Sequence, residues 1–270
     1  MNGGETDPST GAVQGPDIDL LSVDEVSVSF GGLVALDGVS FQVRQGCTVG
    51  LIGPNGAGKT TMFNIVSGLQ RPGSGRVEFA GHDITFEPAH RRAQRGIARS
   101  FQNLGLIAEE TALTNLLAAQ YRAAPYHGLD LLARPWRWRR TENQMHVAAI
   151  NALDRFGLGD IGDRRVKDLS FASARFVELA CVLVNQPQLM LLDEPTTGLD
   201  VREVERLLSV LGSARAEGAT VLLVAHDVRF VMQACDYVYV LAQGRLLSHG
   251  KPSEVQHDPL VLAEYLGTGH

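Results

Sequence analysis

The sequence predicts an α/β fold in which helices cover a parallel β-sheet, with a small antiparallel edge sheet and an inserted helical subdomain. Two wholly apolar runs, 189–192 and 221–224, are typical of parallel strands that are buried on both faces. A third run, 48–52, leads directly into a glycine-rich loop and then into a helical pattern. Strands and helices that alternate in this way indicate an α/β domain, and the chain is long enough to bury a substantial core.

Alternating runs at both ends of the chain predict the antiparallel part. The run 26–30 alternates apolar and polar residues up to a Gly31–Gly32 break, and the run 39–43 alternates again. Because such alternation marks strands with one solvated face, the two runs predict an antiparallel pair joined by a turn. The segment 237–247, centred on Gln243–Gly244, predicts a hairpin near the C-terminus.

Helical periodicity predicts the inserted subdomain, at about 103–168, and a further helix beyond it. One helix of the subdomain is expected to end at Gly157. Its expected apolar face consists of Met145, Ala149, Ile150, Leu153 and Phe156. The later helix is expected to begin at Asp200, since Glu203 stands three residues on, in the capping-box position. Its expected apolar face consists of Val201, Val204, Leu208 and Leu211.

Composition excludes several classes of protein. The 270 residues carry a net charge of −6, which does not suit a nucleic-acid coat, so we expect no nucleic-acid partner. No apolar run approaches the roughly 18–20 residues that cross a bilayer. Residues 1–17 lack the basic and apolar stretches of a secretory signal, and three scattered cysteines indicate reduced thiols. We therefore expect an intracellular globular domain over 18–268, after a flexible lead-in.

Two basic stretches each have two interpretations. The stretch from His90 to Arg99 fits a charged helix face better than a nucleic-acid site. The stretch from Arg134 to Arg140 holds both tryptophans among four arginines. It fits either a contact with a membrane subunit or a solvated loop whose tryptophans pack on the helical subdomain, and we favour the loop.

The glycine-rich loop matches the phosphate-binding pattern G-x-x-x-x-G-K-S/T. Its residues are Gly53, Pro54, Asn55, Gly56, Ala57, Gly58, Lys59 and Thr60, and we include the adjacent Thr61 among the binding residues. Glycines allow positive φ, so successive backbone N–H groups can turn inward around phosphate oxygens, and the helix that follows adds its positive end. The Lys59 ammonium can then contact the β- and γ-phosphates, while Thr60 offers its hydroxyl to Mg²⁺.

A pair of carboxylates follows the apolar run 189–192. Asp193 ends this strand, and ligands of α/β sheets bind at the carboxyl ends of the strands. There Asp193 can hold Mg²⁺ through water, and Glu194 can polarise an attacking water as a general base. Alone, such a pair usually marks a solvated strand end, but together with a phosphate-binding loop it predicts nucleotide hydrolysis.

Six ordered motifs make the sequence, from about residue 20 to 266, resemble the nucleotide-binding subunit of an ATP-binding cassette (ABC) transporter. They are the phosphate loop, Gln102, Leu169–Ser170, Asp193–Glu194, Gly198–Leu199–Asp200 and His226. The resemblance implies a P-loop NTPase core of RecA-like type, with ATP and Mg²⁺ as cofactors. It also implies a dimer with a second cassette subunit, in which each ATP lies between the loop of one subunit and the signature motif of the other.

The resemblance also implies roles for single residues. Phe30 would stack on adenine, Gln102 would ligate Mg²⁺ and link the site to the helical subdomain and the membrane subunit, and Glu194 would be the catalytic base. His226 would contact the γ-phosphate and orient the water. Asp200 would cap its helix and signal across the dimer. For Phe30, an aromatic residue buried in the strand core is an equally good interpretation.

The signature segment departs from the family pattern Leu-Ser-Gly-Gly-Gln. It reads Leu169–Ser170–Phe171–Ala172–Ser173, so Ser170 can still donate to a γ-phosphate, whereas Ala172 replaces a glycine and Ser173 replaces the glutamine. A methyl group at a site of close approach can cost about 1–3 kcal/mol. Since the signature serves the partner's ATP, two arrangements stay open: a heterodimer with unequal sites, or a homodimer that tolerates Ala172.

Segments Phe30–Leu36, Arg99–Asn103 and Tyr265–Gly267 are similar to the branch that imports branched-chain amino acids. The resemblance thus implies an ATP-hydrolysing subunit at the cytoplasmic face of the membrane, which energises import through separate integral-membrane permeases with an extracytoplasmic substrate-binding protein. Cassettes for urea, amides or lipopolysaccharide are similar at several of these points. A cytosolic cassette that acts in translation or DNA repair, and a nucleotide-binding regulator that scarcely hydrolyses, are further alternatives.

Overall fold

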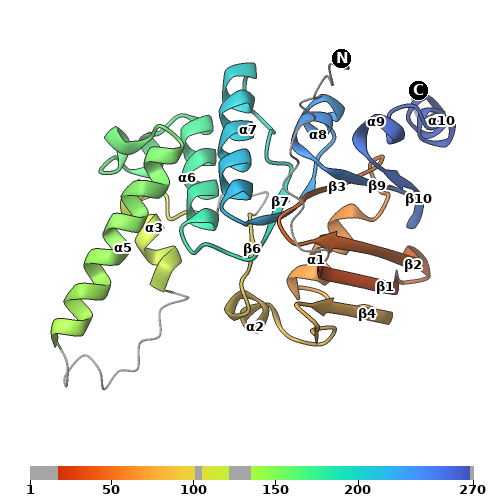
Figure 1. The fold of residues 1–270 in the computed structure, drawn as a ribbon, viewed down its shortest axis with the longest axis horizontal. Helices are drawn as coiled ribbons and strands as arrows, with labels where there is room; N and C mark the ends of the chain where they lie inside the picture. The colour runs from red at the N-terminus through yellow and green to blue at the C-terminus, as the bar shows by residue number, and fades with distance from the viewer. Residues whose placement is uncertain (1–17, 101–104, 122–134, 268–270) are drawn as a thin grey trace, which may run out of the picture.

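The structure is a computed structural model, which describes residues 18–100, 105–121 and 135–267. Its strands form two sheets flanked by helices (Figure 1). In chain order the strands are β1 (Asp19–Phe30), β2 (Leu33–Arg44), β3 (Thr48–Ile52), β4 (Ser74–Phe79), β5 (His82–Asp83), β6 (Ile97–Arg99), β7 (Leu189–Asp193), β8 (Thr220–Val224), β9 (Tyr237–Ala242) and β10 (Arg245–Gly250). The helices are α1 (Lys59–Ser67), α2 (Ala89–Gln94), α3 (Ala112–Tyr121), α5 (Pro135–Arg155), α6 (Phe171–Leu183), α7 (Val201–Ala216), α8 (Val228–Ala234), α9 (Pro252–Val255) and α10 (Pro259–Gly267).

The larger sheet contains the predicted parallel core. Its strand order is β10-β9-β3-β8-β7-β6, and neighbouring strands are parallel except for β9 and β10, which form the predicted hairpin. The smaller sheet, β2-β1-β4-β5, is antiparallel. Strand β1 begins at Asp19, earlier than the alternating run 26–30 indicated, because Leu20, Leu21 and Val23 are buried as well. The α/β fold with an antiparallel edge sheet is confirmed.

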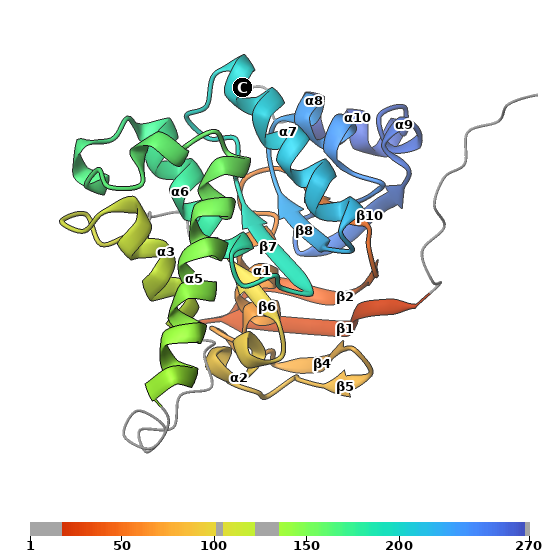
Figure 2. The same cartoon turned by 60° about the vertical axis from the view of Figure 1, so that its left-hand side comes forward.

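Two hydrophobic clusters lie on opposite faces of the larger sheet. Along β7, Leu189 and Leu191 belong to the cluster that contains α1 and the smaller sheet, whereas Met190 and Leu192 belong to the cluster that contains α5, α6 and α7. Strand β7 is thus buried on both faces, as its unbroken apolar run indicated. The helices α3, α5 and α6 group together on the side of the molecule away from β1, β2 and β4 (Figures 1 and 2).

Helix α5 presents a narrower apolar face than the sequence indicated. Met145, Ala149, Leu153 and Phe156 are buried as expected, but Ile150 is exposed. Successive residues of a helix point about 100° apart, so Ile150 lies beyond the edge of the stripe that Ala149 and Leu153 define. The expected stop is confirmed, because Gly157 has a φ of +62° and its N–H donates to the Asp154 carbonyl.

Helix α7 begins as expected but is rotated relative to its predicted face. Asp200 and Glu203 form the reciprocal capping box, with the Glu203 N–H donating to Asp200 at 2.9 Å. The buried residues of the helix are Leu207, Val210, Leu211 and Ala214. Val201 is exposed and Val204 and Leu208 are only half-buried, because the true stripe is centred about a quarter of a turn away from the predicted one.

The stretch from His90 to Arg99 is only in part the charged helix face that was expected: His90 and Arg91 are exposed on α2, but Arg92 is not. The side chain of Arg92 is buried, with 1% of the residue exposed. Its guanidinium donates to the carbonyls of Ile65 and Val66, in the last turn of α1, at 2.6 and 2.9 Å. Burial lowers the pKa of Arg92 to about 10. A buried cation is stabilised here because the last carbonyls of α1 lack partners within the helix.

Some expectations concern residues outside the described ranges. They include the lead-in 1–17, Gln102, and the side chains of Trp136 and Trp138. The backbone from Pro135 onward belongs to helix α5, so the expectation of a loop over the stretch from Arg134 to Arg140 is wrong. The domain bounds 18–268 and 103–168 stay predictions. The three cysteines are free thiols, as expected. Within the described ranges, no helix combines the length and the apolar character that a bilayer span needs.

Candidate nucleotide-binding and catalytic site

The predicted phosphate-binding loop joins β3 to α1. The helix begins at Lys59, and its N-cap Gly58 has a φ of +102°, which few residues other than glycine adopt. A Cβ on Gly53 would lie 2.0 Å from the Leu241 carbonyl oxygen, and one on Gly58 would lie 2.6 Å from that of Ala35. The two glycines therefore let the loop approach β2 and β9 closely, and these contacts fix its backbone at the N-terminus of α1.

The Lys59 side chain folds back into the loop. Its Nζ donates to the carbonyl oxygens of Gly53 and Pro54 at 2.7 and 2.8 Å. Burial lowers the pKa of Lys59, and the nearby carboxylates of Glu194 and Asp193 act in the opposite direction. The ammonium group thus lies within electrostatic reach of both carboxylates, the predicted base Glu194 and the predicted metal ligand Asp193.

The other residues of the loop differ in exposure. Asn55, Gly56 and Thr60 are exposed, Thr61 is half-buried, and Ala57 is buried in the cluster between the sheets. The exposed residues can therefore meet a ligand, while the Ala57 methyl group anchors the loop to the core.

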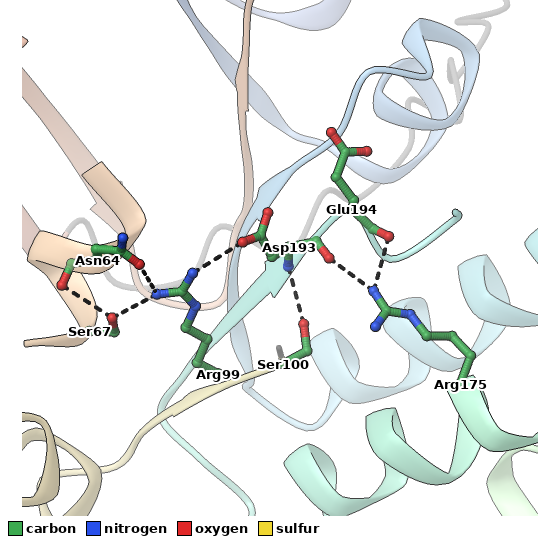
Figure 3. Close-up of polar contacts among 7 residues, drawn as sticks. All are labelled: Asn64, Ser67, Arg99, Ser100, Arg175, Asp193 and Glu194. Atoms are coloured by element: carbon green, nitrogen blue, oxygen red, sulfur yellow. Dashed lines mark hydrogen bonds and ion pairs between the residues drawn. The ribbon is translucent and has the colours of Figure 1, made fainter. Parts of the chain in front are cut away.

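Asp193 lies at the carboxyl end of β7 and is fully buried. Arg99 Nη2 donates to its Oδ2 at 3.1 Å, and the Asp193 N–H donates to Ser100 Oγ at 3.1 Å (Figure 3). Its other carboxylate oxygen, Oδ1, is buried and accepts no hydrogen bond from the residues that the structure describes. A buried carboxylate oxygen without a donor is costly, unless a cation or a ligand completes it.

Asp193 Oδ1 is suited to be a ligand of Mg²⁺. Mg²⁺ in nucleotide sites is bound by one or two protein carboxylates together with waters and phosphates. Within the described ranges there is no cluster of three or more His, Cys, Asp or Glu side chains that could hold a metal alone. Asp193 and the Thr60 hydroxyl are therefore suited to a metal whose remaining ligands come from water and a nucleotide.

Glu194 and His226 lie together at the carboxyl ends of β7 and β8. His226 Nδ1 is 2.6 Å from Glu194 Oε2, and the Glu194 N–H donates to the Val224 carbonyl at 2.8 Å. Glu194 has a φ of +48°, a left-handed conformation that costs a residue other than glycine of the order of 1–3 kcal/mol. Strain of this kind is found at functional sites, where the surrounding structure holds it in place.

Arg99 was not predicted as a site residue. Besides Asp193, its guanidinium contacts Asn64 Oδ1 at 2.7 Å and Ser67 Oγ at 2.9 Å, both on α1 (Figure 3). It therefore connects the helix of the phosphate loop to the buried carboxylate. Strand β6, which it ends, has only three residues, too few for a periodic pattern to mark it in the sequence.

Phe30 lies at the end of β1 with 50% of its surface exposed. The interpretation as a buried aromatic residue of the strand core is therefore wrong. Leu33 and Val34, which follow the turn, are exposed as well. An exposed ring at this position is available for stacking on a flat ligand.

The signature segment forms the start of α6. Ser170 is its N-cap and accepts a hydrogen bond from the Ser173 N–H at 3.2 Å. Ala172 is buried, with 9% exposed, whereas Phe171 is 56% exposed and its ring packs against Gly198. Among the described contacts, the side chains of Ser170 and Asp200 bond only at the starts of their own helices. The structure thus does not bring them into contact with Lys59 or Glu194.

Comparison with known proteins shows the family to which the chain belongs. The family model described as ABC transporter matches residues 36–197. The high-affinity branched-chain amino acid transport ATP-binding protein BraF of Pseudomonas aeruginosa is 36% identical over 249 residues, which cover 92% of this chain and 98% of that protein. LivG of Escherichia coli, which has the same description, is 34% identical with the same coverage.

A solved structure has the same fold. The ADP conformation of an ATP-binding cassette of an ABC transporter aligns with a TM-score of 0.81 and 30% identity, over 93% of this chain and 99% of the other. The alignments with BraF and with this solved structure cover 92% and 93% of this chain. This chain therefore belongs to the ABC transporter family, as one of its ATP-binding cassettes.

Proposed function

We propose that this chain is the ATP-hydrolysing subunit of a transporter that imports branched-chain or related amino acids. The observation that carries the proposal is the 2.6 Å contact between Glu194 and His226, beside the buried Asp193 and within electrostatic reach of Lys59. A base, a group that orients it, a metal ligand and a phosphate-binding cation thus meet at one sheet edge. The relatives whose names specify branched-chain amino acid transport support the substrate class.

Each residue has a distinct task in this proposal. The amides from Gly53 to Thr60 enclose the phosphates, and Lys59 exchanges its two loop carbonyls for phosphate oxygens. Glu194 accepts the proton of the attacking water, and His226 holds the Glu194 carboxylate in its orientation. Asp193 and Thr60 would hold Mg²⁺, which would supply positive charge to neutralise the phosphates.

The exposed signature segment supports pairing with a second cassette. Ser170 and Phe171 lie at the surface, where Ser170 can contact an ATP held by a second cassette. We propose that Phe30 stacks on adenine and that Gln102 ligates Mg²⁺. We propose that the dimer acts at the cytoplasmic face of the membrane, through permease subunits and with an extracytoplasmic substrate-binding protein.

Reconstituted transport tests this function. The full chain is co-expressed with the permeases, the second cassette and the binding protein of its own transporter, and the complex is placed in proteoliposomes. We expect uptake of labelled leucine, isoleucine or valine that requires Mg-ATP and is lost in Lys59→Ala. ATP-dependent transport of urea, an amide or a lipid in place of these amino acids would overturn the substrate assignment, and ATP-independent uptake would overturn the energising role.

A further inference from the structure

Arg175 is a buried charged residue on α6, five positions after Ser170, and 4% of it is exposed. Its Nη1 donates to the Glu178 carboxylate, one turn further along the same helix, at 2.5 Å. Its Nη2 leaves the helix and donates to the backbone carbonyls of Asp193 and Glu194, at 2.9 and 3.0 Å (Figure 3). One nitrogen of the guanidinium thus binds both peptide groups at the end of β7.

These two carbonyls lie where the strained turn at Glu194 begins. The N–H of Glu194 is held by β8, through the Val224 carbonyl, and its C=O is held by α6, through Arg175. The backbone of Glu194 is therefore fixed on both sides in its left-handed conformation, with φ at +48°. The direction of a side chain follows from the backbone that carries it, so these two bonds also set where the carboxylate points.

Arg175 and Arg99 contact the end of β7 from opposite sides (Figure 3). Arg99 bonds a side-chain oxygen of Asp193, whereas the described bonds of Arg175 to this strand end go to main-chain oxygens. Glu178 provides the negative charge that a buried guanidinium requires, and it is itself buried. Burying the Arg175–Glu178 ion pair is costly, so the pair is a weak source of stability. Because Arg175 bonds the backbone of the proposed base, positioning of that base is the more direct role for it.

We infer that Arg175 is a positioning residue for Glu194: by holding the Glu194 carbonyl, it keeps the catalytic carboxylate directed at the attacking water. The inference rests on the proposed function, in which Glu194 is the base. It assigns the helix that starts at Ser170 a task in the hydrolysis of the ATP bound to this chain. Loss of Arg175 frees the peptide after Glu194 to relax, and the carboxylate then turns away from its productive direction.

The test uses Arg175→Gln and Arg175→Lys in the full chain, assembled with its cognate subunits. We expect Arg175→Gln to lower kcat by about 10- to 100-fold, because small misplacements of catalytic groups have effects of this size. The KM for ATP should change little, since the described bonds of Arg175 go to Glu178 and to two backbone carbonyls and not to side chains of the phosphate loop. Arg175→Lys keeps a cation that can donate to both carbonyls, and it should restore kcat in part.

Arg206→Gln is the matched control. Arg206 also lies against α6, with its guanidinium 5.7 Å from the centre of the Phe176 ring, and it also donates to a backbone carbonyl, that of Phe156, at 3.0 Å. It differs from Arg175 in having no bond to the end of β7 among the described contacts. We expect Arg206→Gln to leave kcat near that of the wild type, even where it lowers the melting temperature.

Arg175→Gln in a Glu194→Gln background tests whether Arg175 acts through Glu194. If Arg175 acts through Glu194, adding Arg175→Gln leaves the residual single-turnover rate unchanged, because residues that act as a unit are not additive. A wild-type kcat in Arg175→Gln, an equal loss in Arg206→Gln, or an equal further loss in the Glu194→Gln background would each overturn the inference. If Arg175→Gln does not fold, Arg175→Lys carries both comparisons, and a wild-type kcat there overturns it. Failure of the proposed function is seen separately, as a wild-type chain that does not hydrolyse ATP.

Discussion

The phosphate loop with the end of β7 and the signature segment at the start of α6 are built in different ways. Lys59 and Asp193 are buried; Lys59 donates to a carbonyl of its own loop, and Asp193 accepts a hydrogen bond from Arg99 on β6. Ser170 is exposed, and among the described contacts its side chain bonds only Ser173. Groups that are bonded within the chain are preorganised, whereas exposed ones remain available to another molecule. The phosphate loop and the end of β7 are therefore preorganised within the cassette, whereas the signature segment is exposed and faces outward.

Replacing the proposed base, at the end of β7, should have the largest effect on ATP hydrolysis. Glu194→Gln keeps the size of the side chain but removes the base, so we expect hydrolysis to fall by about 10²- to 10⁴-fold while Mg-ATP still binds. Steady-state ATPase assays and equilibrium binding measure the two quantities. Glu217→Gln, at an exposed ion pair with Arg155, serves as the control. Hydrolysis by Glu194→Gln at the wild-type rate would show that the base lies elsewhere.

Two phenylalanines on α6, one buried and one exposed, allow the contribution of packing to stability to be compared within one helix. Phe176 is buried and stacks on Phe156 with ring centres 5.3 Å apart, so Phe176→Ala should lower the free energy of unfolding by about 3–5 kcal/mol. Phe171→Ala removes a largely exposed ring and should lower it by about 1 kcal/mol or less. Urea unfolding measures both. Equal losses would mean that the signature end is packed as firmly as the core.

Removing Arg99 should weaken the metal site without removing a metal ligand. Arg99→Gln leaves Asp193 Oδ2 without its cationic donor, and loss of such a supporting group typically lowers metal affinity by about 10- to 100-fold. Titration of Mg²⁺ at fixed ATP, or of Mn²⁺ by its paramagnetic resonance signal, measures the affinity. Arg95→Gln, whose parent side chain pairs with Glu87, is the control. A wild-type Mg²⁺ titration in Arg99→Gln would contradict the role of this contact.

The smallest effect is expected at the signature segment. The Ala172 methyl group is mostly buried within this chain, so Ala172→Gly should change turnover by less than about fivefold, or 1 kcal/mol. This outcome favours a homodimer that tolerates Ala172. A rise in turnover of tenfold or more would instead show an impaired signature and favour a heterodimer with unequal sites.

The sequence could predict those parts of the site whose residues are adjacent in the chain. The loop from Gly53 to Thr60 and the pair Asp193–Glu194 are contiguous, and each follows an apolar strand, so local pattern and chemistry coincide. That His226 belongs to the same site as Glu194 followed only from the family resemblance, which placed both at the attacking water; their direct contact was not predicted.

Neither Arg99 nor Arg175 could be predicted as part of the site. Their partners are distant in sequence, 94 positions from Arg99 to Asp193 and 19 from Arg175 to Glu194. Arginine is moreover a residue that is normally exposed, so composition argues against burying it. The misplaced apolar faces at Ile150 and Val201 have a similar origin, since periodicity marks a helix but not which helices surround it.

Equilibrium binding of Mg-ATP tests the central claim most directly, namely that the loop from Gly53 to Thr60 encloses a nucleoside triphosphate. The titration compares the wild-type chain with Lys59→Ala, both assembled with their cognate subunits. We predict saturable binding by the wild type and an affinity weakened by about 10- to 100-fold in Lys59→Ala, because a charged hydrogen-bond donor is lost. A wild-type complex without affinity for Mg-ATP would contradict the claim.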